Sequence, residues 1–563
     1  MTETKKCQNC KKDFTIEPDD FDFYGKINVP PPTFCSSCRL QRRMSFRNER
    51  VLYKRTCDMC SKPIITIFSP DKPYKVYCMT CWWGDKWDAE EYGMEYDPEK
   101  GFFAQVKELN RKVPYPALVV DFNMENSDYV NHAGSCKNCY LIFNGDQCEN
   151  VLYSNTLVHV RDCMDISMVI NAELSYQSID FSGTQIFFSE NCSSCVNTYF
   201  SKDCSGLVNC FGCVNLRNKS YCMWNEQLTK EEYEKRMSEM KLDSYTFIEE
   251  IKKRAREFWL KFPRKYMYGL RNNNVSGDYV YECKNSHSMY QANGAEDCKY
   301  CQFLTMKPTR DAYDLTEWGN NVERVYDCQT VGEGASNIKF CYGVWNTVSD
   351  VEYSCFIVNA SRIFGCVGMH KKENAILNKI YSKEEFVKLR ERIISDMNER
   401  PYTDVKGRTW KYGEFFPYDL SLFNYNESWN MQYFPLSEKE IREAGFAYGE
   451  QKKNVYEITL PAEKIPDSIR GIGDDVLKQV LGCGACGKAF RMVPAELQLL
   501  QRFGFPLPRK CPDCRHMDRM ARINPPKIWN RECAKCKSSI ETSYAPERPE
   551  IVYCEQCYQK EVI

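Results

Sequence analysis

The cysteine pairs at the two ends of the chain constrain its fold more than any other feature. The first eight cysteines form Cys-x-x-Cys pairs, and so do the last eight. Each cysteine of the second group lies 476 residues after its counterpart in the first, so every interval between them matches. The two ends are therefore copies of one module. The cysteines concerned are Cys7, Cys10, Cys35, Cys38, Cys57, Cys60, Cys78, Cys81, Cys483, Cys486, Cys511, Cys514, Cys533, Cys536, Cys554 and Cys557.

Paired cysteines at this spacing are typical of zinc sites. Two such pairs can turn their sulfurs toward one point and complete the tetrahedral thiolate shell that Zn²⁺ prefers. Four pairs in each module predict two closed sites per end, about four zinc ions in all, and a closed shell makes such zinc structural. We favour sequential sharing, in which the first pair joins the second and the third joins the fourth. A cross-brace that interleaves the pairs is the alternative.

A basic segment that could be helical follows the second cysteine pair of each module. Residues 39–55 hold seven basic side chains against one acidic side chain, Glu49. Clustered arginines could contact phosphates, and Trp82, Trp83 and Trp87 could stack on bases. The alternatives are a solvated helix face whose arginines also pair with nearby carboxylates, and tryptophans that cover a seam between domains. The candidate nucleic-acid contacts are Arg39, Arg42, Arg43, Arg47, Arg515, Arg519 and Arg522.

The middle of the chain holds 17 further cysteines, and many of them recur at short, similar intervals. A period of roughly 11 to 15 residues suits one coil of a β-solenoid, in which successive coils pair as parallel strands about 4.8 Å apart. Small cysteines can fill a narrow interior, and asparagines such as Asn138 and Asn150 can form ladders at the turns. Some of these cysteines also make Cys-x-x-Cys pairs, such as Cys136/Cys139, so metal binding in the middle is an open alternative.

The middle is itself duplicated. Phe211–Val214 recurs as Phe364–Val367, 153 residues later. After each copy, Thr229 or Ser382 precedes a Glu by three residues, a capping box that opens a helix. We predict helices over 229–260, broken near Asp243 and Ser244, over 382–398 and over 437–444, and a strand over 454–460.

The resulting fold class is mainly β with some α. Two homologous double-zinc modules, similar to treble clefs, flank a duplicated β-solenoid with inserted helices. The expected division is an N-terminal module at 1–95, a first solenoid half at 96–225, a helical insert at 226–272, a second half at 273–380, a helix at 381–400, an irregular linker domain at 401–480 and a C-terminal module at 481–563.

Composition limits the class of protein further. The chain has 76 basic and 77 acidic side chains, which excludes a uniformly basic nucleic-acid coat. Apolar residues at 43% exclude wholesale disorder. The polar start, Met1 to Lys12, and the absence of long apolar runs predict a soluble cytoplasmic protein without a membrane span. In a reducing compartment, an odd count of 33 cysteines also argues against a disulfide framework.

Several motifs carry a resemblance to a known family. They are Val29–Pro32 before Cys35, Tyr74–Cys81, Phe211–Tyr221 and Glu541–Cys557. With them the chain resembles an uncharacterised family of zinc-binding proteins from uncultivated small-genome bacteria, which carry treble-clef or zinc-ribbon modules around Asn- and Cys-rich repeats. The resemblance implies this fold and zinc, and it implies no activity.

Three classes of function follow from these features. The leading hypothesis is a non-enzymatic scaffold or interaction protein whose zinc modules protect the last strands of a rigid solenoid. The alternative is a nucleic-acid or ribosome contact through the two basic segments. An enzyme that cleaves glycans is less favoured, because no Asp, Glu, His or Ser constellation stands out by spacing. The partner is left open as protein or nucleic acid, and no small-molecule substrate is evident.

Overall fold

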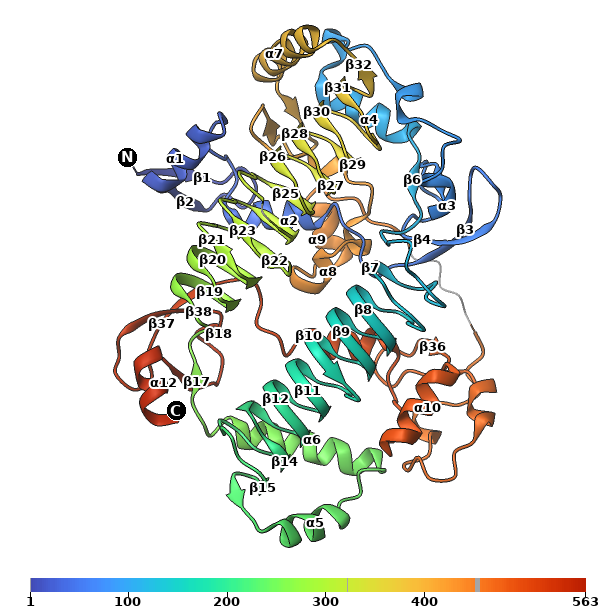
Figure 1. The fold of residues 1–563 in the computed structure, drawn as a ribbon, viewed down its shortest axis with the longest axis vertical. Helices are drawn as coiled ribbons and strands as arrows, with labels where there is room; N and C mark the ends of the chain where they lie inside the picture. The colour runs from blue at the N-terminus through green and yellow to red at the C-terminus, as the bar shows by residue number, and fades with distance from the viewer. Residues whose placement is uncertain (1, 321, 451–455, 563) are drawn as a thin grey trace.

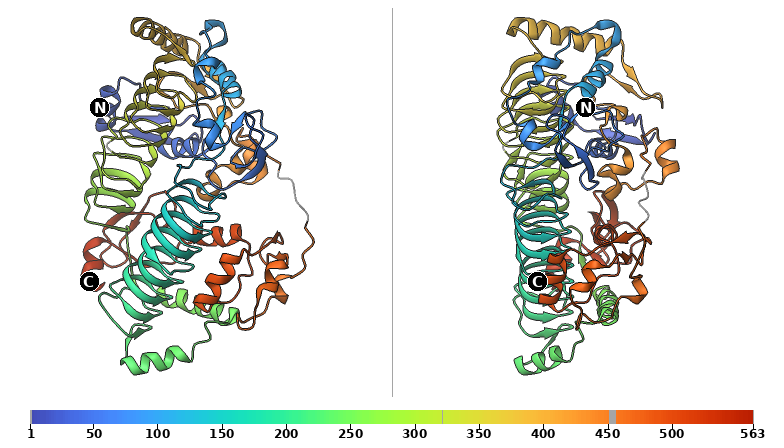
Figure 2. Two further views of the ribbon diagram at one scale, coloured as in Figure 1. Left: turned by 45° about the vertical axis from the view of Figure 1, so that its right-hand side comes forward. Right: turned by 90° about the vertical axis from the view of Figure 1, so that its right-hand side faces the viewer.

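The computed structural model describes residues 2–320, 322–450 and 456–562. This part of the chain is mainly β and contains two β-solenoids, which run as separate ladders of parallel strands (Figure 1). Seen from the side, the solenoids form one layer, and most of both terminal modules lies on one face of it (Figure 2). The predicted fold class is confirmed.

Most coils of the first solenoid have twelve residues, and the coil from Ile179 to its partner Glu190 has eleven. Phe143 pairs with Asn155, and Asn155 pairs with Ser167 on the next coil. Its backbone turns at every third residue through a left-handed conformation, as at Asn144 (φ 54°) and Gln147 (φ 51°). A coil therefore has four corners. Asn and Asp tolerate this conformation better than other non-glycine residues, which accounts for their frequency here.

Corner asparagines form the predicted ladder. The amide of Asn126 donates to Asn138 at 3.2 Å, and the amide of Asn138 donates to Asn150 at 3.1 Å. Asn150 continues the series with a 2.8 Å bond to Asp162 on the following coil. Each rung is thus tied to the next by a side chain as well as by backbone bonds.

Cysteine and serine share the inward positions of the coils. The Cys163 thiol donates to the Arg161 carbonyl at 3.1 Å and accepts from the Ser175 amide at 3.3 Å. The Ser154 hydroxyl does the same, with a bond of 2.7 Å to the Leu152 carbonyl and one of 3.1 Å from the Ile166 amide. All 17 cysteines of the middle are buried and form no disulfide. They act as small interior groups that also satisfy backbone atoms.

The spacing of the cysteines overstated the length of a coil. Inward positions recur every third residue, as at Cys136, Cys139 and Ile142. The interval between Cys148 and Cys163 is therefore one coil of twelve residues plus one side of three. Cysteines can stand on any side of the coil, so their intervals do not measure it. The strands of this solenoid are β7 (Asn131–Gly134), β8 (Phe143–Leu152), β9 (Asn155–Met164), β10 (Ser167–Glu173), β11 (Ile179–Phe187), β12 (Glu190–Tyr199), β13 (Lys202–Ser205), β14 (Val208–Phe211), β15 (Cys222–Met223) and β16 (Glu226–Gln227).

The second solenoid follows the same plan with less regular coils. Thirteen residues separate Leu315 from its partner Cys328, and twelve separate Ser361 from Glu373. Its strands are β18 (Gly269–Leu270), β19 (Asn273–Tyr281), β20 (Lys284–Asn293), β21 (Ala295–Glu296), β22 (Gln302–Leu304), β23 (Thr309–Arg310), β24 (Leu315–Trp318), β25 (Cys328–Val331), β26 (Ser336–Lys339), β27 (Tyr342–Trp345), β28 (Ser349–Glu352), β29 (Cys355–Val358), β30 (Ser361–Phe364), β31 (Glu373–Ile376) and β32 (Lys379–Ile380).

Both solenoids end in the same way. An antiparallel hairpin, β15–β16 in the first and β31–β32 in the second, turns the chain back at the last coil. Helices follow each hairpin: α5 (Lys230–Ser238) and α6 (Tyr245–Trp259), then α7 (Lys383–Glu399). The predicted helices are confirmed, and the break between α5 and α6 falls where it was expected. Thr229 and Ser382 form the predicted capping boxes of α5 and α7.

The terminal modules repeat one order of elements. After the first module, the helix α4 (Phe102–Lys112) and the short strand β6 (Tyr115–Pro116) lead to the first coil, whose earliest bridge joins Val120 to Ala133. The N-terminal elements are β1 (Glu3–Lys6), β2 (Asp13–Ile16), α1 (Pro18–Lys26), α2 (Ser36–Met44), β3 (Tyr53–Thr56), β4 (Pro63–Thr66), β5 (Val76–Tyr77), α3 (Met79–Trp82), α4 (Phe102–Lys112) and β6 (Tyr115–Pro116). The C-terminal elements are β35 (Leu481–Gly482), β36 (Ala489–Phe490), α10 (Pro494–Phe503), α11 (Pro512–Met520), β37 (Trp529–Glu532), β38 (Ser539–Thr542), β39 (Val552–Tyr553) and α12 (Glu555–Val562).

The segment before the second module is mostly irregular. It contains the short helices α8 (Asn430–Tyr433) and α9 (Glu438–Glu443), and α9 confirms the helix expected there. Residues 454 and 455 of the predicted strand lie outside the described residues. The rest forms no strand, although Leu460 makes a single bridge to Leu481. Among the described residues, no helix is long and apolar enough to cross a membrane.

Candidate metal centres and their arginine helices

The structure gathers the terminal cysteines into four groups of four within the residues it describes. In each group the sulfur atoms all lie within 4.8 Å of one another. Every group joins two consecutive pairs, so the prediction of sequential sharing is confirmed. The groups are Cys7, Cys10, Cys35 and Cys38; Cys57, Cys60, Cys78 and Cys81; Cys483, Cys486, Cys511 and Cys514; and Cys533, Cys536, Cys554 and Cys557.

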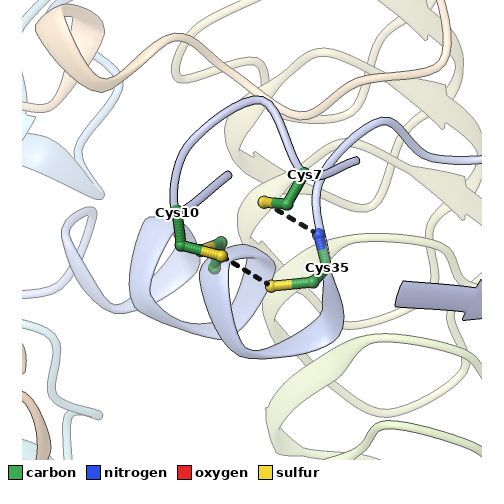
Figure 3. Close-up of side chains that lie close together, drawn as sticks. Cys7, Cys10 and Cys35 are labelled. Carbon is green, nitrogen blue, oxygen red and sulfur yellow. Dashed lines mark hydrogen bonds between the residues drawn. The ribbon is translucent and has the colours of Figure 1, made fainter. Parts of the chain in front are cut away.

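The spacing of the sulfurs fits a tetrahedral metal ion. The Sγ atoms of Cys10 and Cys35 lie 3.8 Å apart and point toward one another (Figure 3). The distance between Sγ atoms is also 3.8 Å for Cys486 and Cys511. A tetrahedron with metal–sulfur bonds of about 2.3 Å has edges of about 3.8 Å. Each group could therefore hold a metal ion by four thiolates.

The same local backbone geometry positions the cysteines of each group. The Cys7 amide donates to the Lys12 carbonyl at 2.9 Å, and Lys11 takes a left-handed conformation (φ 60°), which closes a tight loop around the first pair. Cys35 stands at the N-cap of α2, and its amide donates to Cys7 Sγ at 3.3 Å. Such N–H donors stabilise a thiolate and hold it in place. The corresponding amide–sulfur bonds join Cys78 to Cys57, Cys511 to Cys483 and Cys554 to Cys533.

These donors change the acidity of the first cysteine in each loop. Burial opposes ionisation of Cys483, but backbone amides of Cys511 and Cys486 outweigh it and lower the pKa of Cys483 to about 6. The same balance lowers the pKa of Cys57 to about 7. Thiolates, the form that binds metal, are thus favoured at these positions before any ion is present.

The arginines of the first basic segment are buried in the second solenoid. Side-chain nitrogen atoms of Arg43 lie 3.0 Å from Asp314 and 2.7 Å from Asp327, both at corners of coils. Arg42 also pairs with Asp327 and lies 2.9 Å from Glu414. Arg39 lies 2.9 Å from Asp314, and Arg47 lies 2.6 Å from Glu317 and 3.3 Å from Glu49. All four arginines are at most 2% exposed.

The second basic segment is buried in the first solenoid in the same manner. Arg515 and Arg519 each lie 2.7 Å from a different oxygen of Asp165, a corner residue that is fully buried. Arg522 is less enclosed and lies 3.0 Å from Glu190. Helix α2 is therefore bound to the second solenoid by ion pairs, and helix α11 is bound to the first in the same way. The two contacts are crossed relative to the order of the chain.

Burial corrects the prediction that these arginines contact nucleic acid. Six of the seven candidates, Arg522 excepted, are at most 5% exposed and already paired with carboxylates. A phosphate cannot reach them without opening the module from the solenoid, so the prediction is wrong for these six. The alternative is correct in that these arginines pair with carboxylates, but wrong in that the helix face is buried and not solvated. The signal in the sequence was the recurrence of Arg39 and Arg43 as Arg515 and Arg519, but it did not reveal their partners.

The modules also lie elsewhere than expected. Helices α2 and α10 contact the flanks of the coils, at β24 and β25 and at β9, whereas the hairpins and helices described above close the last coils. Residues 89–95, within the expected N-terminal module, do reach the last hairpin of the second solenoid, where the Met94 amide donates to the Leu377 carbonyl at 2.9 Å. The expectation that the modules cover the solenoid ends is thus wrong for the last coil of the first solenoid. Trp82 and Trp83 pack on His370 of the second solenoid, with ring centroids 4.4 and 5.2 Å away. Trp82 is fully buried, so it covers a seam rather than offering a face to a base.

Cysteine pairs inside the solenoids do not form metal groups. Within the described residues, clusters of three or more potential ligands occur at the terminal cysteines and not at pairs such as Cys136/Cys139. Each of these two thiols instead donates to a carbonyl group two residues earlier in the chain, as Cys139 does to Lys137 at 3.4 Å. Metal binding in the middle is therefore not favoured.

Comparison with known proteins adds little to this description. A scan against family models found no match, and a search of curated proteins found none either. Among solved structures, the chain is similar to one described as a "putative acetyltransferase" from Desulfovibrio desulfuricans G20, at 10% identity. That likeness covers 51% of this chain and 86% of the other, with a TM-score of 0.09, so it carries no argument.

Proposed function

We propose that this protein is a non-enzymatic scaffold in which structural zinc ions fix two solenoids relative to one another. One observation supports the proposal above all others. Each arginine helix starts at a cysteine of a four-sulfur group, as α11 does at Cys511, and ends in buried ion pairs with a solenoid, as at Asp165. Anything that displaces the cysteines also displaces the helix.

Zinc is the ion that suits these groups best. Four thiolates in a closed tetrahedron are the ligand set of structural zinc sites, with no position left for a substrate. Binding of the ion supplies part of the free energy of folding of such a module. The proposed content is about four ions per chain.

A cleft between the two solenoids is the surface that we assign to a protein partner. Its volume is ≈ 560 Å³, and its walls include Ile170 and Leu270, which are 45% and 62% exposed. Tyr268 and Tyr281 of the second solenoid also line it. Exposed apolar and aromatic side chains gathered in one place are typical of protein interaction sites.

Glycan cleavage is less well supported by the same cleft. Asp180 and Asp203 line it, as a pair of catalytic carboxylates would. However, Asp203 is bound to Arg264 at 2.5 Å, and Asp180 accepts from the Tyr281 hydroxyl at 3.1 Å. Both carboxylates are thus engaged in contacts that hold the fold.

Zinc removal followed by small-angle X-ray scattering tests the scaffold proposal. We expect the radius of gyration to rise on chelation, while the circular dichroism of the β-coils is retained, because the arginine helices lose their anchors. An unchanged scattering profile from protein verified to be metal-free would contradict the proposal.

The partner site is tested separately in the host. Complexes recovered with the full-length protein are compared with those of the I170D/L270D variant, which places charges in the cleft. The matched control is V387D/V405D, which changes two other exposed apolar residues, 45% and 86% exposed, that do not line the cleft. Loss of the same partner from both variants would exclude the cleft as the binding surface.

A further inference from the structure

A second cavity lies where α6, the first solenoid and the C-terminal module meet. Its volume is ≈ 450 Å³, and its walls are rich in basic side chains. Lys252 and Arg256 come from α6, Arg509 and Lys510 precede Cys511, and Arg522 follows α11. Small-molecule sites are commonly about 300 to 1,000 Å³ in volume, so the cavity has the size of a ligand pocket.

Several of these cations keep unused hydrogen-bond donors. The side chain of Arg256 has no hydrogen-bond or ion-pair partner among the residues that the structure describes. The buried Nε of Arg509 has no acceptor either, although its Nη2 donates to the Ile465 carbonyl at 3.2 Å and lies 3.8 Å from Asp467. Its guanidinium stacks 4.2 Å from the Tyr245 ring. Lys252 and Lys510 each have one carboxylate partner, at 2.8 and 2.7 Å.

Carboxylates of the protein neutralise only part of the charge. Arg522 pairs with Glu190, which also pairs with Lys202. Arg515 and Arg519 line the cavity as well, and both pair with Asp165. Burial, with repulsion from Arg256, lowers the pKa of Lys252 and of Arg522. Glu249 and Asp518 also line the cavity and pair with Lys252 and Lys510, whereas Arg256 has no such partner among the described residues. A bound anion would relieve the repulsion that remains.

The N-terminal module shows what fills the equivalent place. Thr33 stands 476 residues before Arg509, and its amide and hydroxyl both donate to Glu414 at 2.6 Å. Phe34, the counterpart of Lys510, packs against Trp410, with ring centroids 5.6 Å apart. The chain itself thus supplies a carboxylate and an aromatic ring to the first module.

At the second module basic residues replace Thr33 and Phe34, and the carboxylate nearest to Arg509 is that of Asp467, 3.8 Å from its guanidinium. We propose that the cavity binds a small phosphorylated ligand, whose phosphate accepts hydrogen bonds from the Arg256 guanidinium and from Arg509 Nε. Phosphate suits a site with several cationic donors because each charge-assisted bond is about twice as strong as a neutral one. The inference depends on the geometry of this cavity and not on the scaffold proposal.

Calorimetric titration of the full-length, zinc-loaded protein tests it, with ADP and inorganic pyrophosphate as probes. We expect both to bind, and the K252Q/R256Q variant to weaken binding by about tenfold or more, since charged hydrogen bonds are lost. The matched control K253Q/K261Q removes two exposed charges from the same part of the chain outside the cavity. It should bind within about twofold of the parent.

A second variant tests whether misfolding, rather than loss of the site, explains weaker binding of the probes. Arg509→Thr restores the residue of the first module, and we expect weaker binding with unchanged zinc content and melting temperature. Failure of both probes to bind at about 1 mM would overturn the proposal, as would equal affinity in all variants. It would also be overturned if a short single-stranded RNA bound far more tightly than ADP, because the site would then serve a nucleic acid.

Discussion

Arg519 Nη1 lies 2.7 Å from Asp165 Oδ1, although 354 residues separate the two in the chain. Asp165 is fully buried and also receives Arg515. A buried carboxylate with two guanidinium partners fixes both the helix and the corner of the coil. The equivalent relationship at the other module joins Arg43 to Asp314.

The D165N variant should be strongly destabilised. Removing one partner of a buried ion pair leaves charges without compensation and typically costs about 3 to 5 kcal/mol. Glu173→Gln, which affects the largely exposed pair with Arg161, is the control and should cost less than about 1 kcal/mol. Urea unfolding followed by circular dichroism measures both. Equal losses of unfolding free energy in the two variants would show that the ion pairs of Asp165 with Arg515 and Arg519 contribute little to stability.

Metal content should follow the terminal cysteines alone. Cys10→Ser or Cys486→Ser opens one four-sulfur group, so the zinc content should fall from about four ions to about three. Cys136→Ser changes an inward position of a coil and should leave the zinc content unchanged. Elemental analysis of purified protein checks this, and a parent content near eight would show that the cysteines of the middle also bind metal.

Corner residues should tolerate glycine better than branched side chains. Asn150 is left-handed (φ 54°) and carries a rung of the amide ladder. Asn150→Val should cost about 1 to 3 kcal/mol, since a branched side chain is strained in this conformation and the ladder bond is lost. Asn150→Gly relieves the strain and loses only the bond, so its melting temperature should lie between those of the parent and the valine variant.

Stability should depend on pH through Asp180. Burial, partly offset by the hydrogen bond from Tyr281, raises the pKa of Asp180 from 3.8 to about 7. The folded state therefore holds a proton that the unfolded state has released, and the stabilisation is complete below pH 3.8 and lost as the pH rises through about 7. An amide at this position cannot ionise, so D180N should flatten the decline of unfolding free energy across this window. A parent and variant with parallel pH profiles would contradict this assignment.

The four cysteine groups could be predicted from the sequence because they depend on short intervals between cysteines. Two residues between cysteines and a matched offset of 476 were enough to predict the groups that the structure assembles. The capping boxes at Thr229 and Ser382 depend on equally local rules, and they too were predicted.

Coil length and the roles of the arginines depend on contacts that spacing does not encode. Every third residue of a coil points inward, so the interval between Cys148 and Cys163 can exceed the length of the coil by one side. Arg43 and Asp314 are separated by 271 residues, and nothing near either one identifies the other. The basic segments therefore looked like surfaces for an external anion, although the chain supplies its own.

The ion pairs of α2 with the second solenoid and of α11 with the first also limit the order in which a newly made chain can fold. Arg43 leaves the ribosome hundreds of residues ahead of Asp314, so the first helix must wait, hydrated and undocked, while the coils between them form. Asp165, in contrast, is made early and stays without Arg519 until 354 more residues have been added. Each half of the molecule is thus completed by a distant part of the other, and a nascent chain that stops short of Asp314 has neither of these two sets of ion pairs.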